Sequence, residues 1–130
     1  MHAVYYRDEH GHEPVKDYLA RLPAEHAEAV YVAIDRLNRL LPADPPLPFP
    51  HSSQVDGPLR ELRCHYGRRL YRVLYQRSDN LFVLLHILEK RAAELPGDDK
   101  ATARERWGCY RARMNAAPRR PPRPAGHDAP

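Results

Sequence analysis

The fold is decided by the segment Leu59-Arg60-Glu61-Leu62-Arg63-Cys64-His65-Tyr66-Gly67-Arg68-Arg69-Leu70-Tyr71-Arg72-Val73-Leu74-Tyr75. Gly67-Arg68 has glycine at the first central position, which suits a two-residue type II′ turn between antiparallel strands. In that register Arg63 lies directly opposite Arg72, where like charges repel each other. A fixed pair of guanidinium groups is typical of a site that holds an anion between them.

The alternation of residue types along these two strands predicts a buried face and an open face. Because successive side chains of a strand point to opposite sides, one side carries the apolar residues and is predicted to face the core. Those residues are Leu62, Cys64, Tyr71, Val73 and Tyr75. The other side carries Glu61, Arg63, His65, Arg72 and Gln76. A solvated outer face is the alternative interpretation of this second set.

A third strand is predicted over Leu81 to Leu88, a continuous apolar run that follows the polar turn Ser78-Asp79-Asn80. A three-residue loop would pair Arg72 with His86 and place His86 on the face of the sheet that carries Arg63 and Arg72, here called the arginine face. A two-residue loop would instead turn His86 into the core. The sequence leaves both alternatives open.

A short strand over Ala3 to Arg7 and two helices are predicted ahead of this region. Pro14 suits the first turn of a helix, and Pro23 restarts the chain as a second helix that extends to Leu41. Both helices carry an apolar stripe, which is predicted to pack on the sheet. The stripe residues are Val15, Tyr18, Leu19 and Leu22, then Ala27, Val30, Ile34, Leu37 and Leu41. The His- and acid-rich turn 8–13 is interpreted as a solvated turn, because its side chains lack a second cluster to complete a metal site.

Two proline-rich segments are predicted to lack regular structure. Residues 42–50 contain five prolines and are interpreted as an extended connector into the hairpin. A last helix follows Pro96, with Asp98 or Asp99 as its cap, and extends towards Asn115. Residues 1–116 are predicted to form one domain, and residues 117–130 a disordered Pro/Arg-rich tail that can be deleted without unfolding it.

The charge of the chain is unevenly distributed. Residues 1–59 hold nine Asp and Glu against five Lys and Arg, whereas residues 60–91 hold eight Lys and Arg against three acids. A basic sheet beside acidic helices favours a binding surface for a polyanion on one side of the protein. Cys64 and Cys109 predict no disulfide framework, and no apolar run reaches the length of a membrane span. A soluble cytoplasmic protein is therefore expected.

The order and spacing of several short motifs resemble the phage-derived, HigB-like branch of the RelE/ParE toxin superfamily. The motifs are Asp56-Gly57-x-Leu59-x-Glu61-Leu62-Arg63, Tyr71-Arg72-x-x-Tyr75, Leu84-Leu85-His86 … Glu89-Lys90-Arg91 … Pro96 and Ala103-x-x-Arg106. The likeness covers roughly residues 3 to 110. It implies an α+β fold of the RelE/ParE type, with a small antiparallel sheet in the order strand, two helices, three strands and a final helix. Both N-terminal helices are then expected on one face, which leaves the Arg63/Arg72 face open.

The same resemblance implies the toxin of a type II toxin–antitoxin system that cleaves mRNA on the ribosome without a metal or other cofactor. Such cleavage needs cations at the phosphate and groups that transfer protons. Arg63 and Arg72 suit phosphate binding, since arginine holds its proton too tightly for transfer. The residues predicted as catalytic are Arg63, Arg72, His86 and Lys90. The residues predicted to bind RNA phosphates are Arg60, His65, Tyr75 and Arg91.

Two other functions remain open from the sequence. A ParE-like inhibitor of DNA gyrase would share the fold and cut nothing. An attenuated phage-derived remnant would only bind its antitoxin, and Glu89 favours it because this acid lowers the positive charge beside Lys90. The resemblance implies three partners, namely an antitoxin of the helix-turn-helix type, mRNA and the ribosome; no membrane is expected.

Overall fold

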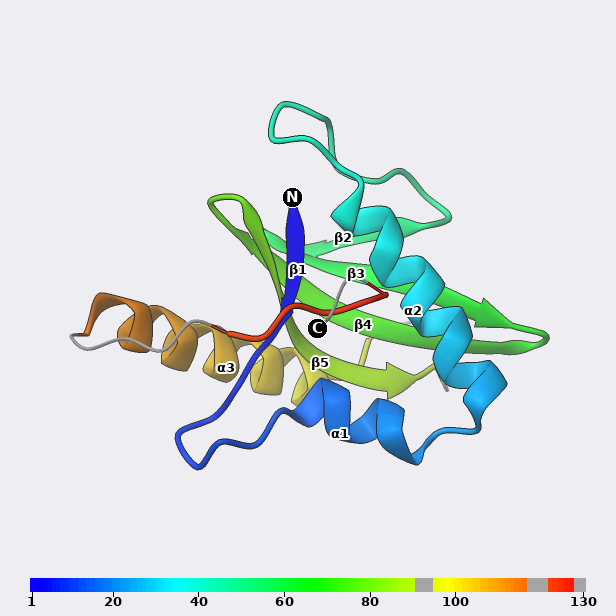
Figure 1. The fold of residues 1–130 in the computed structure, drawn as a ribbon, viewed down its shortest axis with the longest axis horizontal. Coiled ribbons are helices and arrows are strands. Elements are labelled where there is room, and N and C mark those ends of the chain that lie inside the picture. Colours follow the sequence, from blue (N-terminus) through cyan, green and yellow to red (C-terminus); the bar gives the residue numbers. More distant parts are fainter. Residues whose placement is uncertain (91–94, 117–121, 128–130) are drawn as a thin grey trace.

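The structure is a computed structural model that describes residues 1–90, 95–116 and 122–127 (Figure 1). It is a mixed sheet with two helices on one face and a third helix over part of the other face. The elements are β1 (His2–Tyr5), α1 (Pro14–Arg21), α2 (Ala24–Asn38), β2 (Ser52–Asp56), β3 (Leu59–Tyr66), β4 (Arg69–Ser78), β5 (Leu81–Glu89) and α3 (Gly97–Asn115). The strand order is β1-β5-β4-β3-β2. The predicted α+β class is confirmed, but the sheet is not purely antiparallel because β1 runs parallel to β5.

Strand β2 was not predicted. The proline-rich connector ends at Pro50, and the chain then forms a short strand that pairs with β3 instead of entering β3 directly. Gly57, at a φ of +55°, forms the turn between the two strands. The residues of β2 are mostly polar, so its apolar alternation is too weak to identify it as a strand.

The hairpin of β3 and β4 has the predicted register. Arg63 lies opposite Arg72 and Cys64 opposite Tyr71, with Tyr66 facing Arg69 across the turn. Gly67 has a φ of +59°, the conformation that a glycine at the first turn position supplies.

The pairing of β4 with β5 combines the two alternatives that the sequence left open. The turn has two residues, because Ser78 pairs with Leu81. A β-bulge at Leu85 then shifts the register, so that His86 pairs with Leu74 and not with Arg72. The bulge adds one residue to β5 and thereby returns the His86 side chain to the same face as Arg72.

The first core lies between the sheet and the two N-terminal helices, as predicted. Buried residues of α1 and α2 pack there against the apolar face of the central strands (Figure 1). The five strand residues predicted to face this core all belong to it: Leu62, Cys64, Tyr71, Val73 and Tyr75. Burial raises the pKa of the Cys64 thiol to about 12, so this cysteine is an inert core residue.

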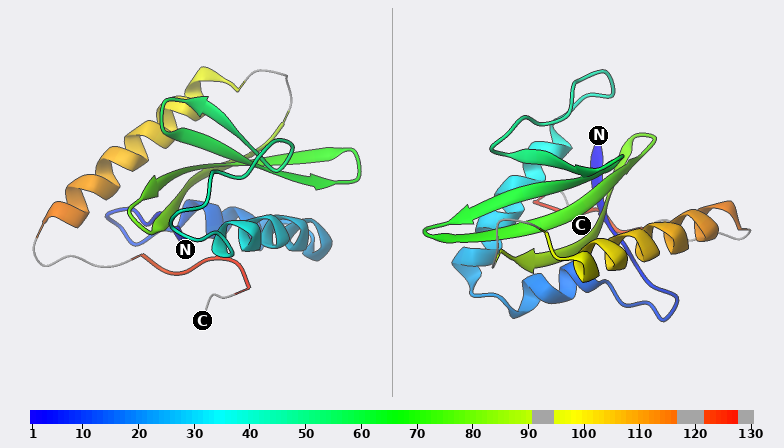
Figure 2. Two further views of the ribbon diagram at one scale, coloured as in Figure 1. Left: turned by 90° about the horizontal axis from the view of Figure 1, so that it is seen from above. Right: turned by 180° about the vertical axis from the view of Figure 1, so that it is seen from behind.

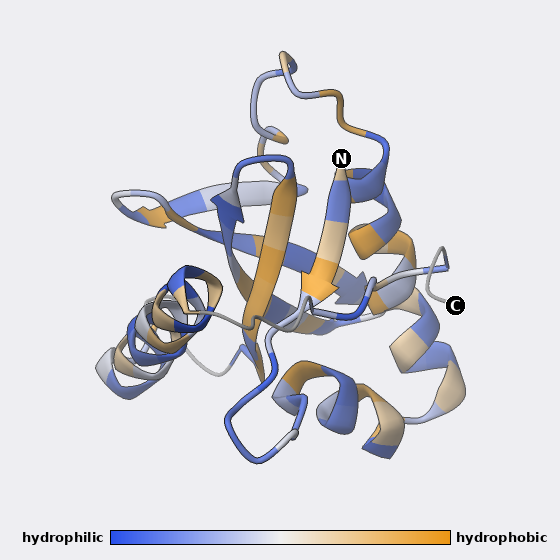
Figure 3. Ribbon diagram, turned by 60° about the vertical axis from the view of Figure 1, so that its left-hand side comes forward, coloured by the Kyte–Doolittle hydropathy of each residue, from blue (hydrophilic) through white to orange (hydrophobic). Residues whose placement is uncertain are grey.

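The opposite face of the sheet is covered in part by α3, which corrects the expectation of an open face. Figure 2 shows α3 on the side of the sheet away from α1 and α2. A second core forms there, in which Ala103 and Tyr110 of α3 pack with Leu74 and Leu85. Apolar residues run along most of β5, which lies between the two helical layers (Figure 3). Within the described ranges no helix is long and apolar enough to cross a membrane.

The C-terminal segment 122–127 differs from the expected disorder, because it lies along β1. The Ala125 amide donates to the carbonyl of Ala3, and the Tyr5 amide donates to the carbonyl of Arg123. The Asn38 side chain bonds both segments, accepting from the Ala3 amide and donating to the Ala125 carbonyl. Ala125 is fully buried in the first core. The remaining residues of the predicted tail lie outside the described ranges.

Gly126→Ala is expected to lower the free energy of unfolding by about 1–2 kcal/mol, the cost of a left-handed backbone for a residue with a Cβ. Gly126 has a φ of +86°, and a Cβ there would lie 2.5 Å from Oδ1 of Asp35. Urea unfolding measures the change. Gly108→Ala is the control, because Gly108 lies in the interior of α3 with open space around it and should gain stability. Equal effects of the two substitutions would contradict the packing of this segment.

The packing of residues 122–127 is expected to weaken as the pH rises. The His127 ring bonds the Glu28 and Asp35 carboxylates, which raise its pKa above the usual value. The interaction is therefore fully present below the unfolded pKa of about 6.5 and is lost as the pH rises through the higher folded pKa. An NMR titration of the Ala125 amide should follow this transition. His127→Gln should abolish the pH dependence, and an unchanged titration would contradict the role of the ring.

Candidate functional site

The centre of the candidate site is a carboxylate between the two facing arginines. Oε1 of Glu61 accepts a hydrogen bond from Nη1 of Arg63 at 3.2 Å and from Oγ of Ser53 at 3.0 Å. Oε2 of Glu61 accepts from Nε of Arg72 and also pairs with its Nη2. An anion does lie between Arg63 and Arg72, as their pairing predicts, but the chain supplies it.

The cluster of Glu61, Arg63 and Arg72, here called the triad, is largely buried. This burial corrects the prediction that Arg72 lies on an exposed face. The side chains of Arg72 and Glu61 are 7% and 3% exposed, and that of Arg63 is 15% exposed. Residues of β2 and residues just before and at the start of α3 surround Glu61 and Arg72, among them Ser53, Val55, Leu95 and Lys100. The pair of like charges is tolerated there because the Glu61 carboxylate forms an ion pair with each guanidinium group.

Two N–H groups of the triad retain binding capacity. Among the described residues, Nε of Arg63 and Nη1 of Arg72 are buried and have no hydrogen-bond partner. A pocket of about 340 Å³ reaches the triad; its lining includes Arg72, Glu61, Ser53 and Lys100. Because a buried donor without a partner is costly, these N–H groups favour an acceptor from outside the chain.

His86 lies at the other side of the same face and is held by α3. Its Nδ1 lies 3.2 Å from Nη1 of Arg106, and its Nε2 lies 2.6 Å from Oδ1 of Asp99. Since Arg106 can only donate, we assign the ring proton to Nε2, which then donates to Asp99. Burial lowers the pKa of Arg106, which also donates to the carbonyl of Leu85. Both ring nitrogens of His86 are thus engaged.

Across the sheet, His86 and the triad are connected through a single residue. Glu61 pairs with Leu74, and Leu74 pairs with His86. Adjacent strands lie about 4.8 Å apart, so the backbones at Glu61 and His86 are roughly 10 Å apart. The structure therefore brings Arg63, Arg72 and His86 to one face but leaves them in two separate clusters.

The remaining predicted residues divide into accessible and inaccessible ones. His65 and Lys90 are exposed near the end of the arginine face, where the Lys90 amide bonds the carbonyl of Leu70, the residue opposite His65. Glu89 forms a two-pronged ion pair with Arg69, and this contact raises the pKa of Arg69. Arg91 lies outside the described residues.

Arg60 and Tyr75, both predicted to bind RNA phosphates, point to the opposite side of the sheet. Tyr75 belongs to the first core, and its hydroxyl lies 2.6 Å from Oγ of Ser52. Nη2 of Arg60 donates to the carbonyl of Leu47. The alternation of β3 explains this placement, because Arg60 is one residue out of phase with Arg63. The structure therefore does not join these two side chains to the arginine face.

Glu61, Asp99 and Arg106 were not predicted as site residues. Glu61 lies two positions before Arg63 on the same strand, so both side chains point to the same face. Their opposite charges were a signal that could have predicted the ion pair. Asp99 was predicted as a helix cap, but α3 begins at Gly97 with Pro96 as its N-cap, so Asp99 lies in the first turn and is free to bond His86. Nothing in the sequence placed Arg106 beside His86.

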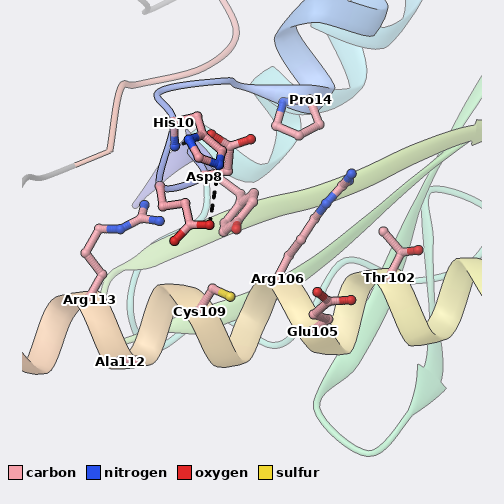
Figure 4. A pocket seen from close by; sticks show the side chains of 11 residues that line it. Asp8, His10, Pro14, Thr102, Glu105, Arg106, Cys109, Ala112 and Arg113 are labelled. Carbon is pink, nitrogen blue, oxygen red and sulfur yellow. Dashed lines mark hydrogen bonds and ion pairs between the residues drawn. The ribbon is translucent and has the colours of Figure 1, made fainter.

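A second pocket, of about 520 Å³, lies between α3 and the turn after β1 (Figure 4). It shares Arg106 with the His86 cluster and also contains Tyr6, Asp8 and Arg113. Its lining contains both acidic and basic side chains, so it favours no single charge of ligand. Among the described residues no group of three or more His, Cys, Asp and Glu side chains is placed to hold a metal ion.

The fold and the site together define a small α+β protein with a paired-arginine cluster on one face of a mixed sheet. Residues 17–108 match the model of the family described as phage-derived protein Gp49-like (DUF891). This match covers most of the chain, so the chain belongs to the Gp49-like family, which is related to the RelE/ParE-like toxins. No curated protein matches the chain.

Proposed function

We propose that this chain is the toxin of a type II toxin–antitoxin system, of the HigB-like branch, and that it cleaves mRNA on the ribosome in the cytoplasm. The relation of the Gp49-like family to RelE/ParE-like toxins supports the toxin class. The basic sheet, on which Arg63 and Arg72 face each other, supports a phosphate as ligand.

The observation that carries the nuclease proposal is the pair of unpartnered N–H groups, Nε of Arg63 and Nη1 of Arg72, in a cluster whose Arg72 and Glu61 line a pocket. A bound phosphodiester would accept hydrogen bonds from both arginines and shift Glu61 towards one of them. Two cations at one phosphate stabilise the charge that develops when the 2′-oxygen attacks it. Arg63 and Arg72 are thus the proposed phosphate-binding catalytic residues.

Proton transfer is assigned to histidine and lysine side chains at the edges of this site. His65 and Lys90 are exposed there and can reach a bound RNA. His86 can take part only if its bond to Asp99 or to Arg106 opens. We propose that the ribosome supplies the remaining orientation of the message, since alignment alone can account for a large part of a reaction barrier.

Induction of the chain in a bacterial host without its antitoxin is expected to arrest growth and translation. The proposed cleavage removes message from translating ribosomes, so incorporation of labelled amino acids should fall before cell density does. Mapping of RNA 5′-ends should show discrete new ends within translated messages. Normal growth at verified soluble abundance would instead favour the attenuated remnant.

A second candidate function is a toxin that binds DNA gyrase and cuts nothing. The observation that favours it is the internal neutralisation of the site, in which Glu61 engages both arginines and Asp99 engages His86. The same induction experiment separates the two functions. A DNA-damage response with intact messages would favour the gyrase inhibitor.

We further propose a small antitoxin with a helix-turn-helix DNA-binding module as the cognate partner. The basic strand region 60–91 supports an acidic partner segment, because opposite potentials favour association. The complex, and not the toxin alone, is then expected to bind operator DNA specifically, which a gel-shift experiment with both preparations tests. Specific binding by the isolated toxin would contradict this assignment.

A further inference from the structure

Phe49 is an exposed aromatic residue at the edge of the arginine face. Its side chain belongs to the proline-rich connector ahead of β2, and the residue is 69% exposed, more than any other large apolar residue that the structure describes. The guanidinium carbon of Arg63 lies 4.9 Å from the centre of its ring. The ring is thus an exposed aromatic surface beside a cation, which is the combination that proteins use to bind single-stranded nucleic acids.

The geometry points to a nucleobase platform: we infer that Phe49 stacks a base of single-stranded RNA whose phosphate is held by Arg63 and Arg72. This inference rests on the proposed function and adds a contact to the base. A ring has two faces, and Arg63 covers one of them, so the exposed area must lie on the other face and the edge. Single-stranded RNA is commonly bound by stacking its bases on aromatic side chains beside cations.

The connector holds the ring in place before any ligand binds. Pro48 and Pro50 flank Phe49, and the Pro48 carbonyl accepts hydrogen bonds from the amides of His51 and Ser52 at 2.9 and 3.2 Å. The His51 carbonyl in turn accepts from the Arg63 amide at 2.9 Å, which ties the connector to β3. Because prolines fix φ and these bonds close the turn, little conformational entropy remains to be lost when a base stacks.

The order of groups across the face matches a nucleotide. Phe49 lies against Arg63, Arg63 lies opposite Arg72, and Glu61 lies between the two arginines. A base on Phe49 would therefore place its own phosphate near the unpartnered Nε of Arg63. Stacking discriminates little between bases, so Phe49 would position the RNA and the ribosome or other contacts would select the sequence.

The test uses the full chain and a six-nucleotide RNA with 2′-O-methyl riboses, which block cleavage, and with 2-aminopurine at its centre. Phe49→Ala is expected to weaken binding about tenfold by fluorescence anisotropy and to abolish the quenching of 2-aminopurine that stacking causes. The salt dependence of binding should not change, because no phosphate contact is lost. Phe49→Trp should retain affinity and quenching, whereas Phe49→Leu, which still covers Arg63 with an apolar group, should behave as Phe49→Ala.

Leu41→Ala is the matched control, because Leu41 is 64% exposed and lies near the start of the same connector. It should bind the RNA as the unchanged chain does. If the Phe49→Ala or Phe49→Leu variant binds the RNA and quenches 2-aminopurine as the unchanged chain does, the inference that Phe49 stacks a base is wrong. The proposed nuclease function would not be affected by that result. If the unchanged chain binds no RNA, both the platform and direct RNA recognition by this face are overturned.

Discussion

Glu61→Ala is expected to lower the free energy of unfolding by about 3–5 kcal/mol, because it leaves two guanidinium groups in a buried site without their counter-ion. Arg72 is the more severely affected, since its side chain is 7% exposed and both of its bonded nitrogens contact Glu61. Urea unfolding measures the loss.

The control for this substitution is Asp56→Ala. Asp56 pairs with Arg104, and both side chains are 55% exposed, so solvent screens the pair and its loss should cost less than about 1 kcal/mol. The double variant Glu61→Leu/Arg72→Leu should recover part of the stability, because it removes the two most buried charges together and leaves only Arg63, which is 15% exposed, without its counter-ion. A loss at Glu61 as small as that at Asp56 would show that solvent reaches the triad.

Under the proposed function, Arg72→Ala is expected to abolish toxicity. Loss of one phosphate-binding cation should cost about 2–4 kcal/mol of transition-state stabilisation, by analogy with the removal of a single oxyanion donor. That cost is roughly a hundredfold or more in rate. Growth after induction at equal soluble abundance measures the effect. Arg72→Lys should restore activity only in part, because an ammonium group lacks the fork of two parallel N–H donors.

Because Arg72 is buried, this substitution also costs stability and needs a control that separates the two effects. Arg72→Ala leaves Glu61 bonded to Arg63 and Ser53, so about 1–3 kcal/mol is expected. Val73→Ala is matched in position and stability, because Val73 is the next residue and is fully buried in the core on the other face. If the two variants are equally toxic, the arginine face has no part in the activity.

Local rules predicted the β3–β4 hairpin, because its register depends only on a two-residue turn and on alternation. Gly67 supplied the turn, and the pairing of Arg63 with Arg72 followed by counting. The bulge at Leu85 was beyond such rules, since Leu84 and Leu85 are both apolar and either can face a core. The position of His86, and with it half of the candidate site, depends on that one residue.

Burial of the arginine face was missed because the apolar stripe of α3 is narrow. Ala103, Trp107, Tyr110 and Met114 recur at helical spacing and pack in or against the second core, among many charged residues. If this stripe had been taken as an apolar face of the last helix, the sequence would have predicted that the helix covers this side of the sheet. The pairing of β1 with residues 122–127 was missed for another reason, because backbone hydrogen bonds form much of this contact and leave no residue pattern in the sequence.

The edge position of β1 has a consequence for how the chain folds during synthesis. β1 precedes the other elements in the chain, yet its neighbours in the sheet are β5 and the segment around Pro124, which follow most or all of those elements. Until Leu81–Leu84 leave the ribosome, His2–Tyr5 has no strand to pair with, whereas β2 to β4 can form from local hairpins. Such a contact closes a long loop of chain, and loops of this length slow folding. Pairing of β1 with β5 and with the segment around Pro124, rather than formation of the hairpins, is therefore expected to be the slow step in folding of the newly synthesised chain.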